Sequence, residues 1–102
     1  MFRISQYMDE IASPTPMGPK RNPPGPVVIW NLIRRCNLTC KHCYSISADK
    51  DFPNELSTAE VFAVMEDLKR FRVPCLILSG GEPLLRPDIF EIAARSKQLG
   101  FF

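Results

Sequence analysis

The sequence predicts an α/β fold with a parallel sheet, built from two successive strand–helix units. The first observation is a pair of short apolar runs, residues 27–33 and 75–79, each followed by a loop. The second is a stretch of helical periodicity after each loop, at residues 57–71 and 87–100. Strand and helix therefore alternate, an order typical of parallel strands joined by right-handed crossovers.

Size and composition limit what the protein can be. A chain of 102 residues, 45% of them apolar and 24% charged, has room for one small domain. Its longest apolar runs, 27–30 and 75–78, are far shorter than the roughly 20 residues of a membrane span. A net charge of +2 is too balanced for a nucleic-acid-binding surface. The first residues include polar and charged ones where a secretory signal would be apolar, so we expect a cytoplasmic protein.

Residues 1–26 are expected to form an arm that precedes a domain at 27–102. The apolar residues of segment 2–11 have helical spacing, which predicts a short helix. Residues 13–26 contain six prolines and two glycines, which exclude a helix and an interior strand. A solvated linker is the favoured interpretation of this stretch. Contact of Lys20 and Arg21 with an anionic partner is the alternative.

The first strand and the first helix have clear sequence signals. Residues 27–33 are rich in β-branched and aromatic side chains and are expected to form a buried strand, with Trp30 in the core. Ser57 and Glu60 have the spacing of a capping box, which predicts that a helix begins there. The apolar face of this helix is expected to consist of Val61, Val64, Met65, Leu68 and Phe71.

The second strand–helix unit follows Pro74, which prevents the first helix from continuing. Cys75 to Ser79 is expected to form the second strand. The next helix is expected to have Pro87 at its first position, with negative charge in its first turn. Basic residues and then Gly100 mark its end.

Three of the four cysteines lie within eight residues, in the cysteine loop (residues 36–43) after the first strand. Cys36, Cys40 and Cys43 have the spacing C-x3-C-x2-C, and three thiolates on a cubane cluster would leave one iron open to another ligand. Structural zinc needs four ligands, and His42 is poorly placed as the fourth because it adjoins Cys43. Cys75 opens an apolar strand, which favours a packing role. The alternative is that Cys75 is the fourth ligand of an iron–sulfur electron carrier.

The glycine loop (residues 79–83, Ser-Gly-Gly-Glu-Pro) follows the second strand. Glycines let the chain bend sharply and let a ligand approach closely. Loops that follow parallel strands lie at the same edge of a sheet, where α/β folds bind ligands. If the two strands are neighbours, the cysteine loop and the glycine loop are therefore within reach of one small molecule.

The cysteine loop and the glycine loop, each following a predicted strand, resemble the motifs of radical S-adenosyl-L-methionine (SAM) enzymes. The resemblance implies a [4Fe-4S] cluster whose metal ligands are Cys36, Cys40 and Cys43, with SAM bound at the open iron. It also implies that one electron from the reduced cluster cleaves SAM to a 5′-deoxyadenosyl radical. The cofactor carries this chemistry, and the protein positions it and excludes water.

The same resemblance implies which other residues bind the cofactor. Gly80, Gly81 and Glu82 match the segment that contacts the SAM amino group, and His42 matches a position beside the adenine. The fold implied is a (β/α)6 radical SAM barrel. Because such proteins are several times longer than this chain, we expect its two βα units to be the N-terminal part of an incomplete barrel that does not act on substrate alone.

Segments 23–49, 55–62 and 71–93 resemble the haem d1 biosynthesis family of the NirJ type over nearly the whole chain. This resemblance implies an enzyme that modifies propionate side chains of a sirohaem-derived tetrapyrrole. It also implies a low-potential electron donor such as ferredoxin or flavodoxin, with neither nucleic acid nor membrane as a partner. Radical SAM enzymes of the alternative haem pathway and peptide-modifying members share the cysteine loop and remain alternatives.

Overall fold

The computed structural model describes residue 12 and residues 25–102. The helix expected at 2–11 and the Pro-rich stretch up to residue 24, with Lys20 and Arg21, lie outside the described residues. The elements that are described follow in the order strand, helix, strand, short 3-10 helix and helix. This order confirms the predicted alternation, apart from the 3-10 helix.

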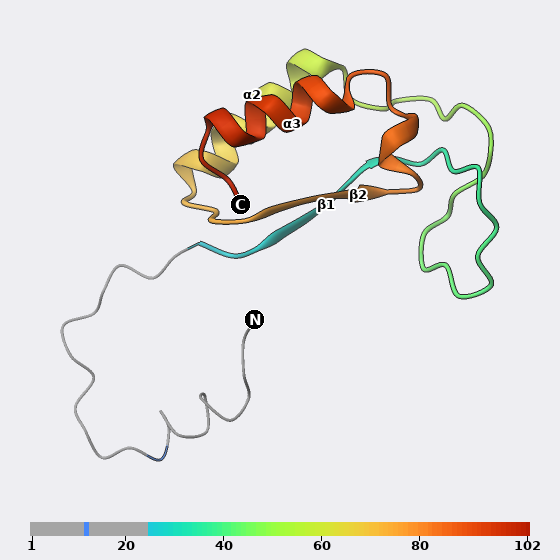
Figure 1. Cartoon of the computed structure of the whole chain (residues 1–102), viewed down its shortest axis with the longest axis horizontal. Coiled ribbons are helices and arrows are strands. Elements are labelled where there is room, and N and C mark those ends of the chain that lie inside the picture. Colours follow the sequence, from blue (N-terminus) through green and yellow to red (C-terminus); the bar gives the residue numbers. More distant parts are fainter. Residues whose placement is uncertain (1–11, 13–24) are drawn as a thin grey trace.

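The sheet consists of β1 (Val28–Ile33) and β2 (Leu76–Gly80), which pair in parallel as predicted. The register runs from Val28 beside Leu76 to Ile33 beside Gly80, with an irregularity after Asn31. Each strand begins one residue later than expected, and β2 extends to Gly80. Figure 1 shows the two strands side by side, so their carboxyl ends lie at the same edge.

Two α-helices, α2 (Thr58–Arg70) and α3 (Ile89–Gln98), lie next to each other over one face of the sheet (Figure 1). Trp30 is only partly buried and packs at the margin of the core rather than inside it. On the opposite face of the sheet, Ile29 and Ile77 remain 64% and 44% exposed. The buried core consists of Leu32, Val61, Met65, Val73, Leu76, Ile89, Ile92 and Phe101.

Helix α2 begins at the predicted capping box. The Ser57 side chain accepts from the Glu60 N–H, and the Glu60 carboxylate accepts from the Ser57 N–H at 2.8 Å. The expectation that Phe71 belongs to the apolar face is wrong, because Phe71 is the C-cap and is 72% exposed. Arg72 then turns the chain with a φ of 60°, so that Val73 enters the core instead.

Helix α3 begins later than predicted. Pro87 was expected at the first helical position but precedes the N-cap, Asp88. A 3-10 helix, η1 (Pro83–Leu85), lies between the glycine loop and α3 and was not predicted. The end of α3 is as predicted, with basic residues in the last turn and Gly100 at a φ of 80°. Among the described residues, no helix is long and apolar enough to cross a membrane.

Candidate functional site

The cysteine loop leaves the sheet at the carboxyl end of β1. Cys36 is buried, with 8% of its surface exposed, and its N–H donates to the Ala48 carbonyl at 3.1 Å. A parallel bridge between Arg35 and Ala48 lies beside this bond. The chain therefore leaves the end of β1, passes through the cysteine loop and returns to the same point.

The two arginines before Cys36 fix the base of this loop. Arg35 forms ion pairs with Asp49 and Asp51, each at 3.0 Å, and the hydrogen bond to Asp49 is the main cause that raises the pKa of Arg35. The Arg34 guanidinium lies 4.4 Å from the centre of the Phe52 ring. Both side chains thus contact the segment that follows the cysteine loop.

Within the loop, the thiols of Cys40 and Cys43 are exposed. The Cys43 N–H donates to the Cys40 carbonyl at 3.1 Å, which closes a tight turn. The Cys43 thiol donates to the Ser45 carbonyl at 3.4 Å. His42 lies on the exposed turn, and the described part of the chain shows no hydrogen bond to its ring.

The three predicted cluster ligands occupy one loop, but their thiols do not converge. Among residue 12 and residues 25–102, no group of three His, Cys, Asp or Glu side chains is placed to hold a metal ion. The chemistry of the donor set nevertheless fits a [4Fe-4S] cluster. All three thiols are free, two of them are exposed, and thiolates are the ligands that such clusters take. To bind a cluster, the exposed turn has to bring Cys40 and Cys43 toward Cys36.

The glycine loop lies directly against the base of the cysteine loop. The Gly81 N–H donates to the Ile33 carbonyl at 2.7 Å, and the Glu82 N–H donates to the Arg35 carbonyl at 2.9 Å. A Cβ on Gly80 would lie 2.3 Å from the Ile33 oxygen, and one on Gly81 would lie 2.2 Å from the Arg35 oxygen. Only glycine permits these contacts, so the two loops meet as predicted.

The Glu82 side chain has a local role in this structure. One of its carboxylate oxygens accepts from the Leu84 N–H at 3.0 Å, and this bond caps η1. Glu82 is half-buried, and its backbone faces the residue before Cys36. The carboxylate is therefore held beside the base of the cysteine loop.

Cys75 lies at the other edge of the sheet. Its carbonyl accepts from the Val28 N–H at 3.1 Å, next to the first residue of β1. Cys36 lies three residues beyond the last residue of that strand, so the whole length of β1, about 17 Å at the usual rise per residue, lies between the two cysteines. The preferred packing role of Cys75 is not supported either, because the side chain is only half-buried and is not among the core residues.

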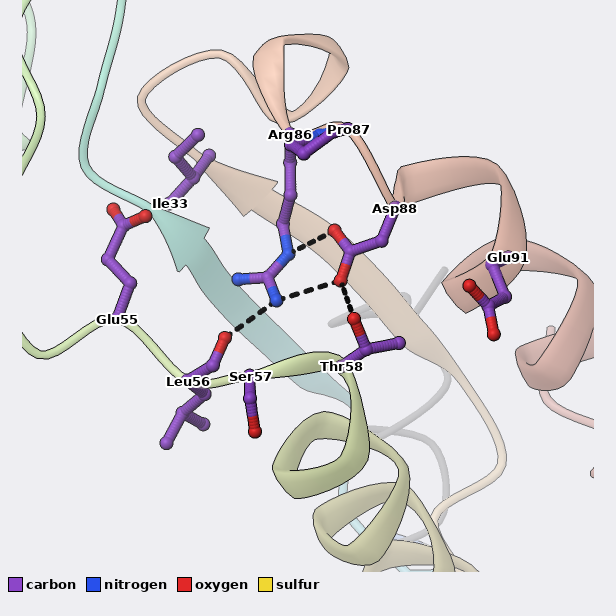
Figure 2. A pocket seen from close by; sticks show the side chains of 9 residues that line it. All are labelled: Ile33, Glu55, Leu56, Ser57, Thr58, Arg86, Pro87, Asp88 and Glu91. Atoms are coloured by element: carbon purple, nitrogen blue, oxygen red, sulfur yellow. Dashed lines mark hydrogen bonds and ion pairs between the residues drawn. The ribbon is translucent and has the colours of Figure 1, made fainter.

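Sequence reasoning missed Arg86, which is 7% exposed and lines a pocket of about 500 Å³. Figure 2 shows its guanidinium directed toward Asp88 and the Leu56 carbonyl, with Thr58 bonded to the same carboxylate. The available signal was the pair of opposite charges, Arg86 and Asp88, with apolar residues on both sides and close after the glycine loop. A charge in such a position needs buried partners.

Comparison with known families and proteins gives one matching family model. The model described as the radical SAM superfamily matches residues 30–101. The pre-heme d1 synthase of Dinoroseobacter shibae is 60% identical over 97% of this chain. The Fe-coproporphyrin III synthase of Methanosarcina barkeri is 51% identical over 74% of it, and the mycofactocin maturase of Mycobacterium tuberculosis is 43% identical over 62%.

The chain spans 24%, 19% and 16% of the length of these three relatives, respectively. No solved structure matches the chain. Most of the length of these relatives therefore has no counterpart in this chain.

Proposed function

The chain belongs to the radical SAM superfamily, and from this membership we propose that residues 27–102 form the first two βα units of a (β/α)6 radical SAM barrel. Two parallel strands with both helices on one face support this assignment. In a barrel, the uncovered face with Ile29 and Ile77 would turn toward the interior. Residues 1–26 would then be the arm that precedes the barrel.

We propose that Cys36, Cys40 and Cys43 hold a [4Fe-4S] cluster and that SAM binds at its open iron. When bound, the cluster supplies the single electron for reductive cleavage of SAM. The single observation that carries this proposal is the bond from the Glu82 N–H to the Arg35 carbonyl. It holds the glycine loop against Arg35, the residue before Cys36, at the edge where both strands end, and this supports a shared site.

The chain's own residues would bind and orient SAM. Gly80 and Gly81 keep backbone atoms, rather than side chains, at the meeting point of the two loops. The Glu82 carboxylate is suited to accept from the SAM amino group, because within the described residues only one of its oxygens accepts a hydrogen bond, the one that caps η1. His42, on the exposed turn, would lie beside the adenine once the thiols converge.

We propose that the protein acts in haem d1 biosynthesis, on propionate side chains of a sirohaem-derived tetrapyrrole. Support comes from identity to the pre-heme d1 synthase, which at 60% over 97% of the chain exceeds the 51% over 74% found for the Fe-coproporphyrin III synthase. A low-potential donor such as ferredoxin or flavodoxin would supply the electron. The free thiols suit a reducing, cytoplasmic compartment.

The alternative of an iron–sulfur electron carrier requires Cys75 as the fourth ligand. Cys75 adjoins the amino end of β1, whereas the cysteine loop leaves the carboxyl end. The intervening strand is about 17 Å long at the usual rise per residue, which is more than the distance between two cysteine ligands of one cubane cluster, so the fold disfavours this alternative.

Disruption of the encoding gene tests the proposed pathway. We expect cells without the protein to lose haem d1, which can be extracted and quantified by its absorption, and to regain it when the gene is restored. Haem d1 content that is unchanged by the disruption would contradict the proposed substrate, while leaving the cluster and SAM assignment to be judged on its own tests.

A further inference from the structure

We infer that Arg86 is a positioning residue for the glycine loop, which is the proposed binding segment for SAM. Arg86 is the last residue of segment 80–86, and it holds this end of the segment against the end of β1. It thereby fixes where Glu82 lies. The structural part of this inference stands on contacts within the chain. Its consequence for SAM rests on the proposed function.

The contacts of the Arg86 guanidinium account for its burial. Its Nη1 donates to the Leu32 carbonyl at 3.1 Å, and its Nη2 donates to the Leu56 carbonyl at 2.7 Å. Its Nε and Nη2 form a two-pronged ion pair with Asp88, at 2.6 and 3.0 Å (Figure 2). Every nitrogen of the guanidinium therefore has a partner, as a buried charge requires.

Through Arg86, segment 80–86 is attached to the end of β1 at a second point. Near its start, Gly81 and Glu82 donate to the carbonyls of Ile33 and Arg35. At its end, Arg86 donates to the carbonyl of Leu32. Both ends are thus tied to residues 32–35, where β1 ends and leads into the cysteine loop.

The chain between the two attachments is short and hydrogen-bonded to itself. It forms the single turn of η1, closed by the Leu85 N–H to the Glu82 carbonyl at 3.0 Å and by the Arg86 N–H to the Pro83 carbonyl at 3.0 Å. Because the turn starts at Glu82 and ends at Arg86, we expect a shift of the guanidinium to move Glu82 as well.

Asp88 indicates that this arrangement has a role besides helix stability. It is the N-cap of α3, yet its side chain makes no capping bond. The carboxylate instead pairs with Arg86 and accepts from the Thr58 hydroxyl at 2.6 Å. An Asp at this position usually caps its own helix, so the carboxylate is used to orient the guanidinium.

The geometry requires arginine rather than any cation. A planar guanidinium donates in several directions at once, whereas a lysine ammonium is a point charge on a flexible stem. Lysine at position 86 could pair with Asp88 but could not keep the bonds to both Leu32 and Leu56. We therefore expect it to recover only part of the positioning.

Arg86→Gln and Arg86→Lys test the inference, with Arg95→Gln as the matched control. Arg95 also joins α2 to α3, through Glu66, but does so in the last turn of α3 and away from the glycine loop.

The first readout is hydrogen exchange at the Glu82 amide in the metal-free full chain, corrected for global stability from denaturant unfolding. We expect Arg86→Gln to accelerate this exchange by roughly tenfold or more, which is the effect of losing one hydrogen bond to a charged group. Arg86→Lys should give a smaller increase, and Arg95→Gln almost none.

The second readout is SAM binding by the reconstituted full chain, measured with iron content. Arg86→Gln should weaken SAM binding by about 10- to 100-fold with iron content preserved. If hydrogen exchange at the Glu82 amide is no faster in either Arg86 variant than in Arg95→Gln, the inference is overturned. Should Arg86→Gln fail to fold, the comparison of Arg86→Lys with Arg95→Gln serves as the test. If the unaltered chain binds no SAM while Glu82 exchange responds as expected, the proposed function fails and the positioning role stands.

Discussion

The backbone N–H of Glu82 donates to the carbonyl oxygen of Arg35 at 2.9 Å, so the glycine loop touches the residue immediately before Cys36. The two residues are far apart in the sequence and are brought together because β1 and β2 are parallel neighbours. A ligand held by Glu82 would therefore lie beside whatever Cys36 binds.

Replacing Cys36, Cys40 or Cys43 with alanine is expected to prevent stable cluster assembly, because three ligands on one loop act together. Cys75→Ala is the matched control and should leave iron and sulfide content unchanged after anaerobic reconstitution. Loss of the cluster in Cys75→Ala, with circular dichroism showing an intact fold, would refute the assignment of three ligands.

Gly81→Ala should separate the two loops, since its Cβ would lie 2.2 Å from the Arg35 carbonyl oxygen. The expected cost of this steric clash is about 1–3 kcal/mol of stability, measured by denaturant unfolding, together with weaker SAM binding. Gly100→Ala is a suitable comparison, because at a φ of 80° it is strained by about 1–2 kcal/mol but lies outside both loops. SAM affinity reduced equally in the two variants would indicate a general effect of stability rather than loop contact.

Glu82→Gln removes the charge of the side chain and keeps an oxygen that can accept from the Leu84 N–H. We expect SAM binding to weaken by about 10- to 100-fold with iron content unchanged, as for the loss of one charge-assisted hydrogen bond. Glu82→Ala also removes the cap of η1. This variant should therefore bind SAM no more tightly than Glu82→Gln and should have a lower free energy of unfolding. Unchanged SAM affinity in Glu82→Gln would reduce the carboxylate to a capping group.

The pair of Arg86 and Asp88 predicts a stability change in acid. The Arg86 hydrogen bond is the main cause that lowers the pKa of Asp88 below its ordinary 3.8, so the folded state favours the carboxylate. The stabilisation is present in full above about pH 3.8 and is lost as the pH falls through the lower pKa of the folded state.

Asp88→Asn should therefore destabilise the chain at neutral pH, on the order of 3 kcal/mol, because it leaves a buried guanidinium without its counter-charge. The difference from the unaltered chain should narrow in acid below pH 3.8, measured by urea unfolding. Asp67→Asn removes an exposed pair with Arg70 and should change stability by less than about 1 kcal/mol. A gap between Asp88→Asn and the unaltered chain that does not vary with pH would contradict the assigned partner.

Much of the fold could be predicted from local signals. The capping box at Ser57 and Glu60 and the two apolar runs each depend on neighbouring residues, and the structure confirms both. Phe71 is exposed because the chain turns at Arg72 with a positive φ, and a positive φ at arginine has no reliable sequence signal. The helical spacing of Phe71 therefore wrongly predicted that it lies on the apolar face of the helix.

The meeting of the two loops was predictable because parallel strands end at the same edge of a sheet. The role of Arg86 was not, since its partners Leu32 and Leu56 lie 54 and 30 residues away and are backbone carbonyls, which any residue provides. Sequence spacing could not predict that the three thiols point apart among the described residues, because spacing sets which residues share a loop and not where their side chains point.

Electron paramagnetic resonance of the reduced, reconstituted full chain, with and without SAM, tests most directly whether the two loops form one cofactor site. If the three cysteines hold a cluster with an open iron beside Glu82, saturating SAM should change the spectrum of the cluster. A cluster whose spectrum is identical with and without SAM would contradict the proposed site.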